Sequence, residues 1–151
     1  MALKVELKPG EKLIVGETLI TNDKQRARFF IQGDAPILRE KDILLPEDAS
    51  TMAQQVYLAV QVMYLKQDIT VTQKEYFDVI GKILQAAPST RDLISEISTA
   101  ILREELYRAL KLAKKLIEYE RTLISHVSTS NSGISAVRKH LGLSGSEGSG
   151  S

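Results

Sequence analysis

The sequence contains no cysteine and no tryptophan, and its only histidines are His126 and His140. Without cysteine the chain forms no disulfide, no thiolate metal site and no thiol nucleophile. It also lacks a glycine-rich phosphate loop, a paired-histidine metal motif and a Gly-x-Ser-x-Gly elbow. We therefore expect no metal, no cofactor and no catalytic residue, and we predict that the protein is not an enzyme.

The sequence also lacks an excess of one charge sign. Its 151 residues include 20 basic and 19 acidic ones, which leaves a net charge of +1. This balance excludes a strongly cationic wrapper of nucleic acid but leaves room for a local basic patch. No apolar stretch approaches the roughly 20 residues of a membrane span, so we expect no membrane partner and a cytoplasmic location.

The first part of the chain, residues 1–45, has the pattern of short β-strands. Leu3, Val5 and Leu7 alternate with charged residues, as in a half-buried strand. Further strands are predicted at 13–15, 18–21, 26–32 and 37–39, with Asn22-Asp23 as a hairpin turn between the third and fourth. These features predict a small antiparallel sheet or partial barrel.

Residues 50–127 have helical periodicity, so the fold class is predicted to be α+β. Ser50 or Thr51 can cap the first helix, and Thr72 with Glu75 has the form of a capping box for the second. A third helical segment opens at Ser89 or Thr90 and reaches about Ser125, with Ser98–Arg103 as the place where it could break. Residues 128–151 are predicted to be a flexible tail that starts with a polar break and ends in a Gly/Ser-rich run.

One candidate site is a basic strand. In an extended conformation Lys24, Arg26, Arg28 and Phe30 share one face, while Ala27, Phe29 and Ile31 would face the core. Cations beside an aromatic ring can hold a phosphate backbone and stack a base, which predicts RNA binding. The same residues also fit a second interpretation, in which positive charge protects an edge strand from association.

The long helix supplies two further candidates. Its basic face predicts RNA contacts, although it also fits an ordinary solvated face with a Glu104–Arg108 pair. Its apolar stripe predicts an oligomer or partner interface, and we expect a homo-oligomer. The basic face consists of Arg108, Lys111 and Lys115, and the stripe of Leu106, Leu110, Ala113, Ile117 and Ile124.

Four segments in order along residues 1–127 resemble one family. They are LKPGEK at Leu7–Lys12, ILREKDI at Ile37–Ile43, MYL at Met63–Leu65 and ALKLAKKLIEYE at Ala109–Glu120. Together they are similar to the FlbT family of bacterial flagellum-biosynthesis regulators.

This resemblance implies a post-transcriptional regulator that binds the 5′ untranslated region of flagellin messenger RNA and controls its translation and decay. Such proteins are usually repressors and in some lineages activators. The implied partner is the flagellin mRNA leader. The alternative is a protein-interaction adaptor or chaperone for flagellin or another flagellar regulator. The resemblance implies no catalytic residue and no RNA-contact motif, so the candidate sites above come from the residues themselves.

Overall fold

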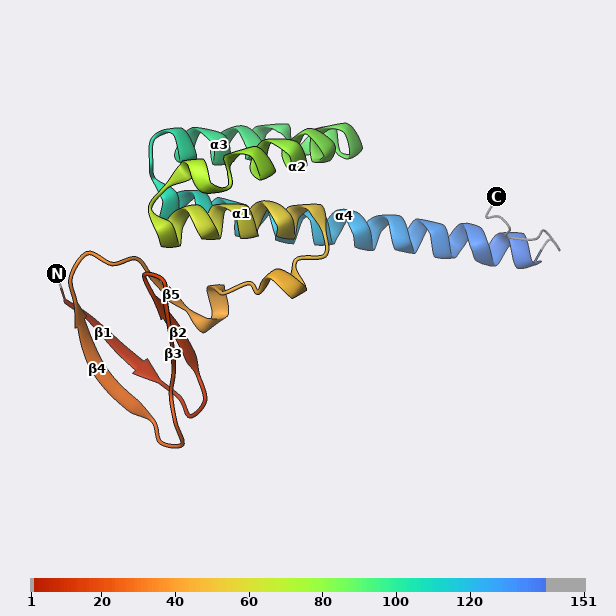
Figure 1. Cartoon of the computed structure of the whole chain (residues 1–151). Helices are drawn as coiled ribbons and strands as arrows, with labels where there is room; N and C mark the ends of the chain where they lie inside the picture. Colours follow the sequence, from red (N-terminus) through yellow and green to blue (C-terminus); the bar gives the residue numbers. More distant parts are fainter. Residues whose placement is uncertain (1, 141–151) are drawn as a thin grey trace. The chain divides into compact units, whose positions relative to one another are not determined.

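Alternating apolar and polar residues form the N-terminal strands at the predicted positions. A computed structural model describes residues 2–140, and the surroundings of side chains as far as His126. Strand β1 pairs antiparallel with β4, and a second sheet has the order β3-β2-β5 (Figure 1). The strands are β1 (Ala2–Leu7), β2 (Lys12–Val15), β3 (Thr18–Thr21), β4 (Ala27–Gln32) and β5 (Ile37–Arg39).

The hairpin predicted at Asn22-Asp23 is wrong. Strands β3 and β4 belong to different sheets, so the chain crosses from one sheet to the other at this point. The Asn22 amide donates hydrogen bonds to the carbonyls of Leu7, Lys8 and Gln25 at 2.8–3.0 Å. Asn22 therefore joins the end of β1 to the start of β4, and the local turn signal did not reveal this long-range role.

The core of the strand region lies between the two sheets. Val5, Leu7 and Leu13 are buried, and Phe29 and Ile31 pack against them. Val5 and Leu7 occupy alternate positions of β1, and Phe29 and Ile31 alternate positions of β4, which confirms the predicted inward face of the basic strand.

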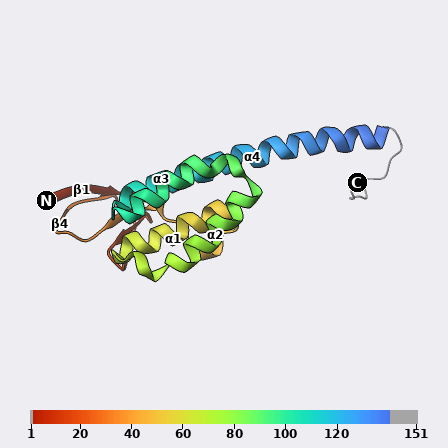
Figure 2. The same ribbon diagram turned by 90° about the horizontal axis from the view of Figure 1, so that it is seen from above.

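Four helices follow the strands, which confirms the predicted α+β fold class. They are α1 (Met52–Lys66), α2 (Gln73–Ala86), α3 (Arg91–Leu102) and α4 (Leu106–His140), with 3-10 turns η1 (Glu40–Asp42), η2 (Pro46–Asp48), η3 (Ile69–Val71) and η4 (Pro88–Thr90). Helices α1 and α2 run side by side, as Figure 2 shows. Buried residues recur on each helix at three- and four-residue spacing, so the helices pack their apolar faces together.

The two helix starts with capping signals behave differently. Thr51 caps α1 with a complete capping box, in which Gln54 is the reciprocal partner. The capping box predicted at Thr72 and Glu75 is wrong, because the Thr72 hydroxyl instead donates to the carbonyl of Ala59 at 2.6 Å. A tertiary contact with α1 has replaced the local cap.

The predicted long segment breaks at the end of the expected window. Helix α3 ends at Leu102 and α4 begins at Leu106, with Glu104 in the left-handed region at φ 58°. The Glu105 N–H donates to the carbonyl of Ala100 at 2.8 Å, which closes the end of α3. A reversal of this kind folds α4 back so that its first turns are buried.

The C-terminal prediction differs from the structure in one respect. Helix α4 continues through 128–133, where the sequence predicts a polar break. Serine, threonine and asparagine lower helix stability by only a few tenths of a kcal/mol each, and a preformed helix propagates through them. Residues 1–116 form one compact unit and a second begins at Ile117. The modules predicted at 1–45 and 50–127 stay a prediction, and the end of the tail, 141–151, lies outside the described residues.

A polar stripe on α1 ties the helices to the strands. Tyr57, Gln61 and Tyr64 follow each other at helical spacing, and each contacts the main chain of the segment 37–44. Gln61 donates to the carbonyl of Leu44 and accepts from its N–H, at 2.9 and 2.8 Å. The Tyr64 hydroxyl does the same with Ile37, at 2.9 and 3.2 Å, and the Tyr57 hydroxyl donates to the carbonyl of Asp42.

The polar stripe predicts the effect of changing Gln61, which is only 6% exposed. Gln61→Met keeps the side-chain length but leaves the N–H and carbonyl of Leu44 unpaired. We expect a loss of about 1–3 kcal/mol in the free energy of unfolding, measured by urea denaturation. Gln55→Met on the exposed face of α1 is the control and should change this free energy by less than about 0.5 kcal/mol. An equal effect of both changes would contradict the structural role of Gln61.

Buried tyrosines predict a loss of stability in alkali. Burial raises the pKa of Tyr57, with the negative charge of Asp42 as a second cause, and burial also raises the pKa of Tyr64 and Tyr76. The folded state therefore holds these protons more tightly than the unfolded state. The stability is present below pH ~10, the ordinary tyrosine pKa, and is lost as the pH rises above it.

Tyr57→Phe should make this alkaline loss of stability less steep, as measured by urea denaturation at a series of pH values. A wild-type slope in the Tyr57→Phe variant would show that Tyr57 does not contribute.

Candidate nucleic-acid interface

The solvent-facing side of the β1–β4 ribbon gathers cations around an aromatic ring. Register places Lys4 opposite Phe30 and Glu6 opposite Arg28, so all four side chains share this face. Phe30 is 69% exposed, which is unusual for phenylalanine. We call Lys4, Glu6, Arg26, Arg28 and Phe30 the ribbon face.

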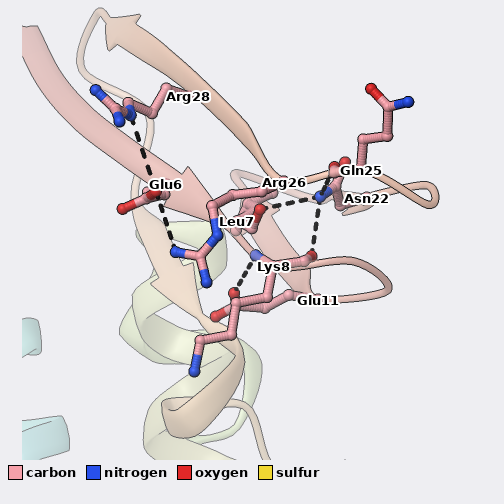
Figure 3. Close-up of polar contacts among 8 residues, drawn as sticks. All are labelled: Glu6, Leu7, Lys8, Glu11, Asn22, Gln25, Arg26 and Arg28. Carbon is pink, nitrogen blue, oxygen red and sulfur yellow. Dashed lines mark hydrogen bonds and ion pairs between the residues drawn. The ribbon is translucent and has the colours of Figure 1, made fainter.

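Glu6 organises the two arginines of the ribbon face (Figure 3). Its Oε2 atom lies 3.1 Å from Nη1 of Arg26 and 3.8 Å from Nε of Arg28. The hydrogen bond from Arg26 is the main cause that lowers the pKa of Glu6, and the charges of both arginines and Lys4 add to it. One carboxylate therefore positions two guanidinium groups and partly neutralises them, while both stay more than half exposed.

Lys24 and Arg26 lie outside the strand in which the sequence placed them. Lys24 is exposed in the bend between β3 and β4, and Arg26 comes just before the first residue of β4. The structure thus brings Arg26, Arg28 and Phe30 together and leaves Lys24 at the end of the ribbon. Both interpretations of the strand remain open, because the cations are exposed and also ion-paired.

The basic residues predicted on α4 are exposed but partly engaged. Arg108 lies 3.9 Å from the carboxylate of Glu105, and the Lys111 ammonium lies 5.2 Å from the centre of the Tyr107 ring. Lys115 is exposed. The neighbouring Lys114 is instead a structural residue, since its ammonium binds the carboxylate of Asp42.

An open pocket of about 460 Å³ lies next to the basic start of α4. Tyr107 packs against Tyr64 with ring centres 5.7 Å apart, and both line the pocket with the basic residues Arg39 and Lys41. Ile31 lines it too, and Ile31 is on the inward face of β4, opposite to Phe30. The basic residues at the start of α4 and those of the ribbon face therefore do not lie on the same side of the β1–β4 ribbon.

The predicted oligomer or partner interface is largely inside the protein. Leu106, Leu110 and Ala113 are buried against the chain's own core. Ile117 is half-buried and Ile124 is half-exposed, so only this later part of the stripe is open to another molecule. Helical periodicity indicated burial correctly but could not show that the chain's own residues provide it.

Sequence reasoning missed Lys4 and Glu6 as members of the ribbon face. Their alternation with apolar residues marked them as outward-facing, but their neighbours depended on the pairing of β1 with β4. That pairing joins residues more than twenty positions apart and has no local signal.

Other kinds of site find little support in the described residues. Among the described residues, no cluster of three or more aspartate, glutamate or histidine side chains could hold a metal ion. Within the same part, no helix is both long enough and apolar enough to cross a membrane.

Comparison with protein families shows which family the chain belongs to. The family model described as "Flagellar protein FlbT" matches residues 3–124. The chain belongs to the FlbT family. This membership assigns the chain to the regulation of flagellum biosynthesis and to a family of regulators, not of known enzymes.

Named FlbT relatives cover almost the same part of the chain. A "Probable flagellum biosynthesis repressor protein FlbT 1" of Bradyrhizobium diazoefficiens is 54% identical over 124 residues, covering 82% of this chain and 85% of the relative. The FlbT of Rhodopseudomonas palustris is 47% identical over 83% and 99% of the two chains. The "Flagellum biosynthesis repressor protein FlbT" of Caulobacter vibrioides is 36% identical over 90% and 96%. No solved structure matches the chain significantly.

Proposed function

We propose that this FlbT-family protein represses flagellin expression by binding the 5′ untranslated region of flagellin mRNA, and that the ribbon face holds the RNA. The observation that carries the proposal is Phe30, an exposed aromatic ring on a strand with Lys4 opposite and Arg28 two residues away. Relatives named as flagellum biosynthesis repressors support repression as the direction of regulation.

The chemistry of the ribbon face suits a single-stranded segment. An unpaired base stacks on an exposed aromatic ring whatever its sequence, and nearby cations hold the adjoining phosphates. Arg28 lies two residues before Phe30 on β4, Lys4 lies opposite Phe30 on β1, and both are exposed. A double helix would hide its bases from Phe30, so we expect the target to be a loop or an unpaired leader region.

Binding through this face would act by occupancy. RNA held across the ribosome-loading region blocks translation, and a message without ribosomes is open to nucleases. With a net charge of only +1, the protein gains affinity from the local patch and not from its overall charge. The basic residues of α4 extend the contact where a leader is long enough to reach them.

A protein-interaction adaptor is the alternative function. Most of its predicted surface is the apolar stripe of α4, and Leu106, Leu110 and Ala113 are buried inside the chain. The exposed Ile124 is what remains of that surface. Capture of a flagellar protein that survives nuclease treatment would favour the adaptor over RNA binding.

The first prediction concerns the ribbon face itself. Phe30→Ala should weaken binding to a single-stranded flagellin leader by about 1–3 kcal/mol, because a base loses its stacking partner. Changing Lys24, Arg26 and Arg28 together to alanine should also reduce the slope of log K against log salt, by roughly 0.7 for each phosphate that the protein no longer binds. Filter binding at several salt concentrations measures both effects.

Lys82→Ala is the control for the basic residues, since Lys82 is an exposed cation on α2. It should leave both the affinity and the salt slope close to wild type. Unchanged binding by the triple variant would remove the ribbon face from the RNA site. Binding that disappears only when Arg108, Lys111 and Lys115 are changed would move the site to α4.

The second prediction uses the carboxylate that neutralises the arginines. Glu6→Gln should tighten RNA binding several-fold and steepen its salt dependence, because Arg26 and Arg28 lose their competing anion. Glu47→Gln, at the exposed turn η2, makes the same change in net charge far from the ribbon and should have little effect. Weaker binding by Glu6→Gln would show that the arginines need the carboxylate to hold their position.

A further inference from the structure

Strand β3 forms an unprotected edge of the three-stranded sheet. Within the described part of the chain it pairs only with β2, and its residues, Thr18, Leu19, Ile20 and Thr21, are all exposed. Leu19 is 56% exposed and Ile20 is 36% exposed. Natural edge strands are kept very short or carry a lysine, a proline or a bulge that prevents pairing with another chain; β3 is short, with four residues, but has no lysine, proline or bulge.

The opposite edge of the same sheet is covered in part by helix α1. On β5 the outward main-chain groups belong to Ile37 and Arg39, and the Tyr64 hydroxyl bonds both the N–H and the carbonyl of Ile37. Tyr64 therefore satisfies Ile37 as a neighbouring strand would. No described residue does this for β3, so its outer edge keeps unpaired donors and acceptors.

Hydrogen bonds on the β5 side show which residues of β2 face which neighbour. The Gly16 N–H donates to the carbonyl of Pro36, and the Lys12 N–H donates to the carboxylate of Glu40. Main-chain groups alternate in direction along a strand, so the even-numbered residues of β2 face β5 and the odd-numbered ones face β3. The bond from the Asn22 N–H to the carbonyl of Glu11 agrees with this alternation.

The alternation also fixes the free groups of β3. Leu13 lies opposite Ile20, and Val15 lies opposite Thr18, so Ile20 and Thr18 bond to β2. The N–H and carbonyl groups of Leu19 and Thr21 then point away from the sheet. These free groups are placed symmetrically about Ile20.

We propose that β3 pairs antiparallel with β3 of a second copy of this chain, about a two-fold axis at Ile20. Leu19 of each copy lies opposite Thr21 of the other, and each such pair exchanges two main-chain hydrogen bonds. Ile20 lies opposite Ile20 of the second copy in a non-hydrogen-bonded position, where side chains approach most closely. The two three-stranded sheets thereby become one continuous sheet.

Symmetry and charge both favour a second copy as the occupant. An isologous contact brings the same patch of both copies together, so a charge on the two-fold axis would meet a like charge, and a charge elsewhere in the patch would be buried against an uncharged residue. The segment Thr18–Thr21 carries no charge. Just outside it, Glu17 comes opposite Asp23 of the second copy, but the Glu17 carboxylate already binds the Lys66 ammonium at 2.9 Å.

Side-chain packing supports the same register. Leu19 lines an apolar pocket of about 220 Å³ together with Ile14, Val62 and Leu65. In the proposed register Thr21 of the second copy lies across from Leu19, beside this pocket. The edge is short, so the dimer is weak and depends on concentration. It involves neither the ribbon face nor the stripe of α4, and it stands whether or not the protein binds RNA.

Cysteine cross-linking tests the pairing, because the chain contains no cysteine of its own. In Ile20→Cys the two cysteines face each other across the axis with Cα atoms about 4.5 Å apart, which a disulfide can span. Mild oxidation at micromolar protein should convert Ile20→Cys into a covalent dimer. Leu102→Cys is the control for chance collisions, since Leu102 is 73% exposed on α3.

Two further variants test the register. In Thr21→Cys alone the cysteines are displaced by about 7 Å along the strands, beyond the reach of a disulfide, so it should react no faster than the Leu102→Cys control. A mixture of Leu19→Cys with Thr21→Cys places the two cysteines opposite each other and should give a heterodimer.

Charge pairing provides a test that needs no cross-link. Ile20→Lys and Ile20→Glu should each be monomeric by sedimentation velocity, and their equimolar mixture should regain the dimer. Circular dichroism confirms that each variant is folded. Cross-linking of Ile20→Cys no faster than Leu102→Cys would overturn the proposal. Efficient cross-linking through Ile124→Cys together with a slow Ile20→Cys would also overturn it and place the contact on α4.

Discussion

The fold depends on side chains of α1 that hydrogen-bond the main chain of an otherwise unpaired segment. The outer edge of β5 and the chain that follows it have N–H and carbonyl groups that would be costly to bury without partners. Gln61 bonds both groups of Leu44, and the Tyr64 hydroxyl bonds both groups of Ile37. In each case a side chain does what the main chain of a neighbouring strand would do. These contacts fix the sheet on the helices and satisfy the outward groups of Ile37 at one of its edges.

For the proposed RNA binding, the ribbon face is a compromise with structure. Three cations on a small surface repel one another, and Glu6 offsets that repulsion by contacting Arg26 and Arg28. The same contact lowers the attraction for phosphate. No comparable structural reason explains the presence of phenylalanine at position 30. The ring of Phe30 is mostly in solvent, whereas Phe29 on the other side of the strand packs in the core. An exposed aromatic ring next to a held pair of arginines is easier to explain by a ligand than by stability.

Local patterns in the sequence predicted the elements but not their partners. Alternation gave the strands of β1 and β4 and the inward position of Phe29. It could not show that β1 pairs with β4, so the turn signal at Asn22 was assigned to a hairpin that does not exist. Thr72 likewise has the local signature of a cap, but a carbonyl of α1 lies within reach of its hydroxyl. Each error comes from a contact between distant parts of the chain.

The same limit applies to the candidate site. Arg28 and Phe30 follow from a period of two along one strand, whereas Lys4 and Glu6 join them only through the sheet register. The periodic stripe of α4 indicated that Leu110 is covered, but a helix pattern does not distinguish the chain's own core from a partner. The open edge of β3 was also hidden, since four uncharged residues between turns predict a strand but do not show whether it lies inside a sheet or at its edge.

The pairing of β1 with β4 has a consequence for synthesis on the ribosome. Lys4 leaves the ribosome early, but its neighbour Phe30 follows only after the whole β2–β3 hairpin. The hairpin is local and can form first, which shortens the loop that the two outer strands must close. The surface around Phe30 therefore comes into existence only when the N-terminal region has been completed. A nascent or unfolded chain carries the same cations but has no organised face on which to place a base.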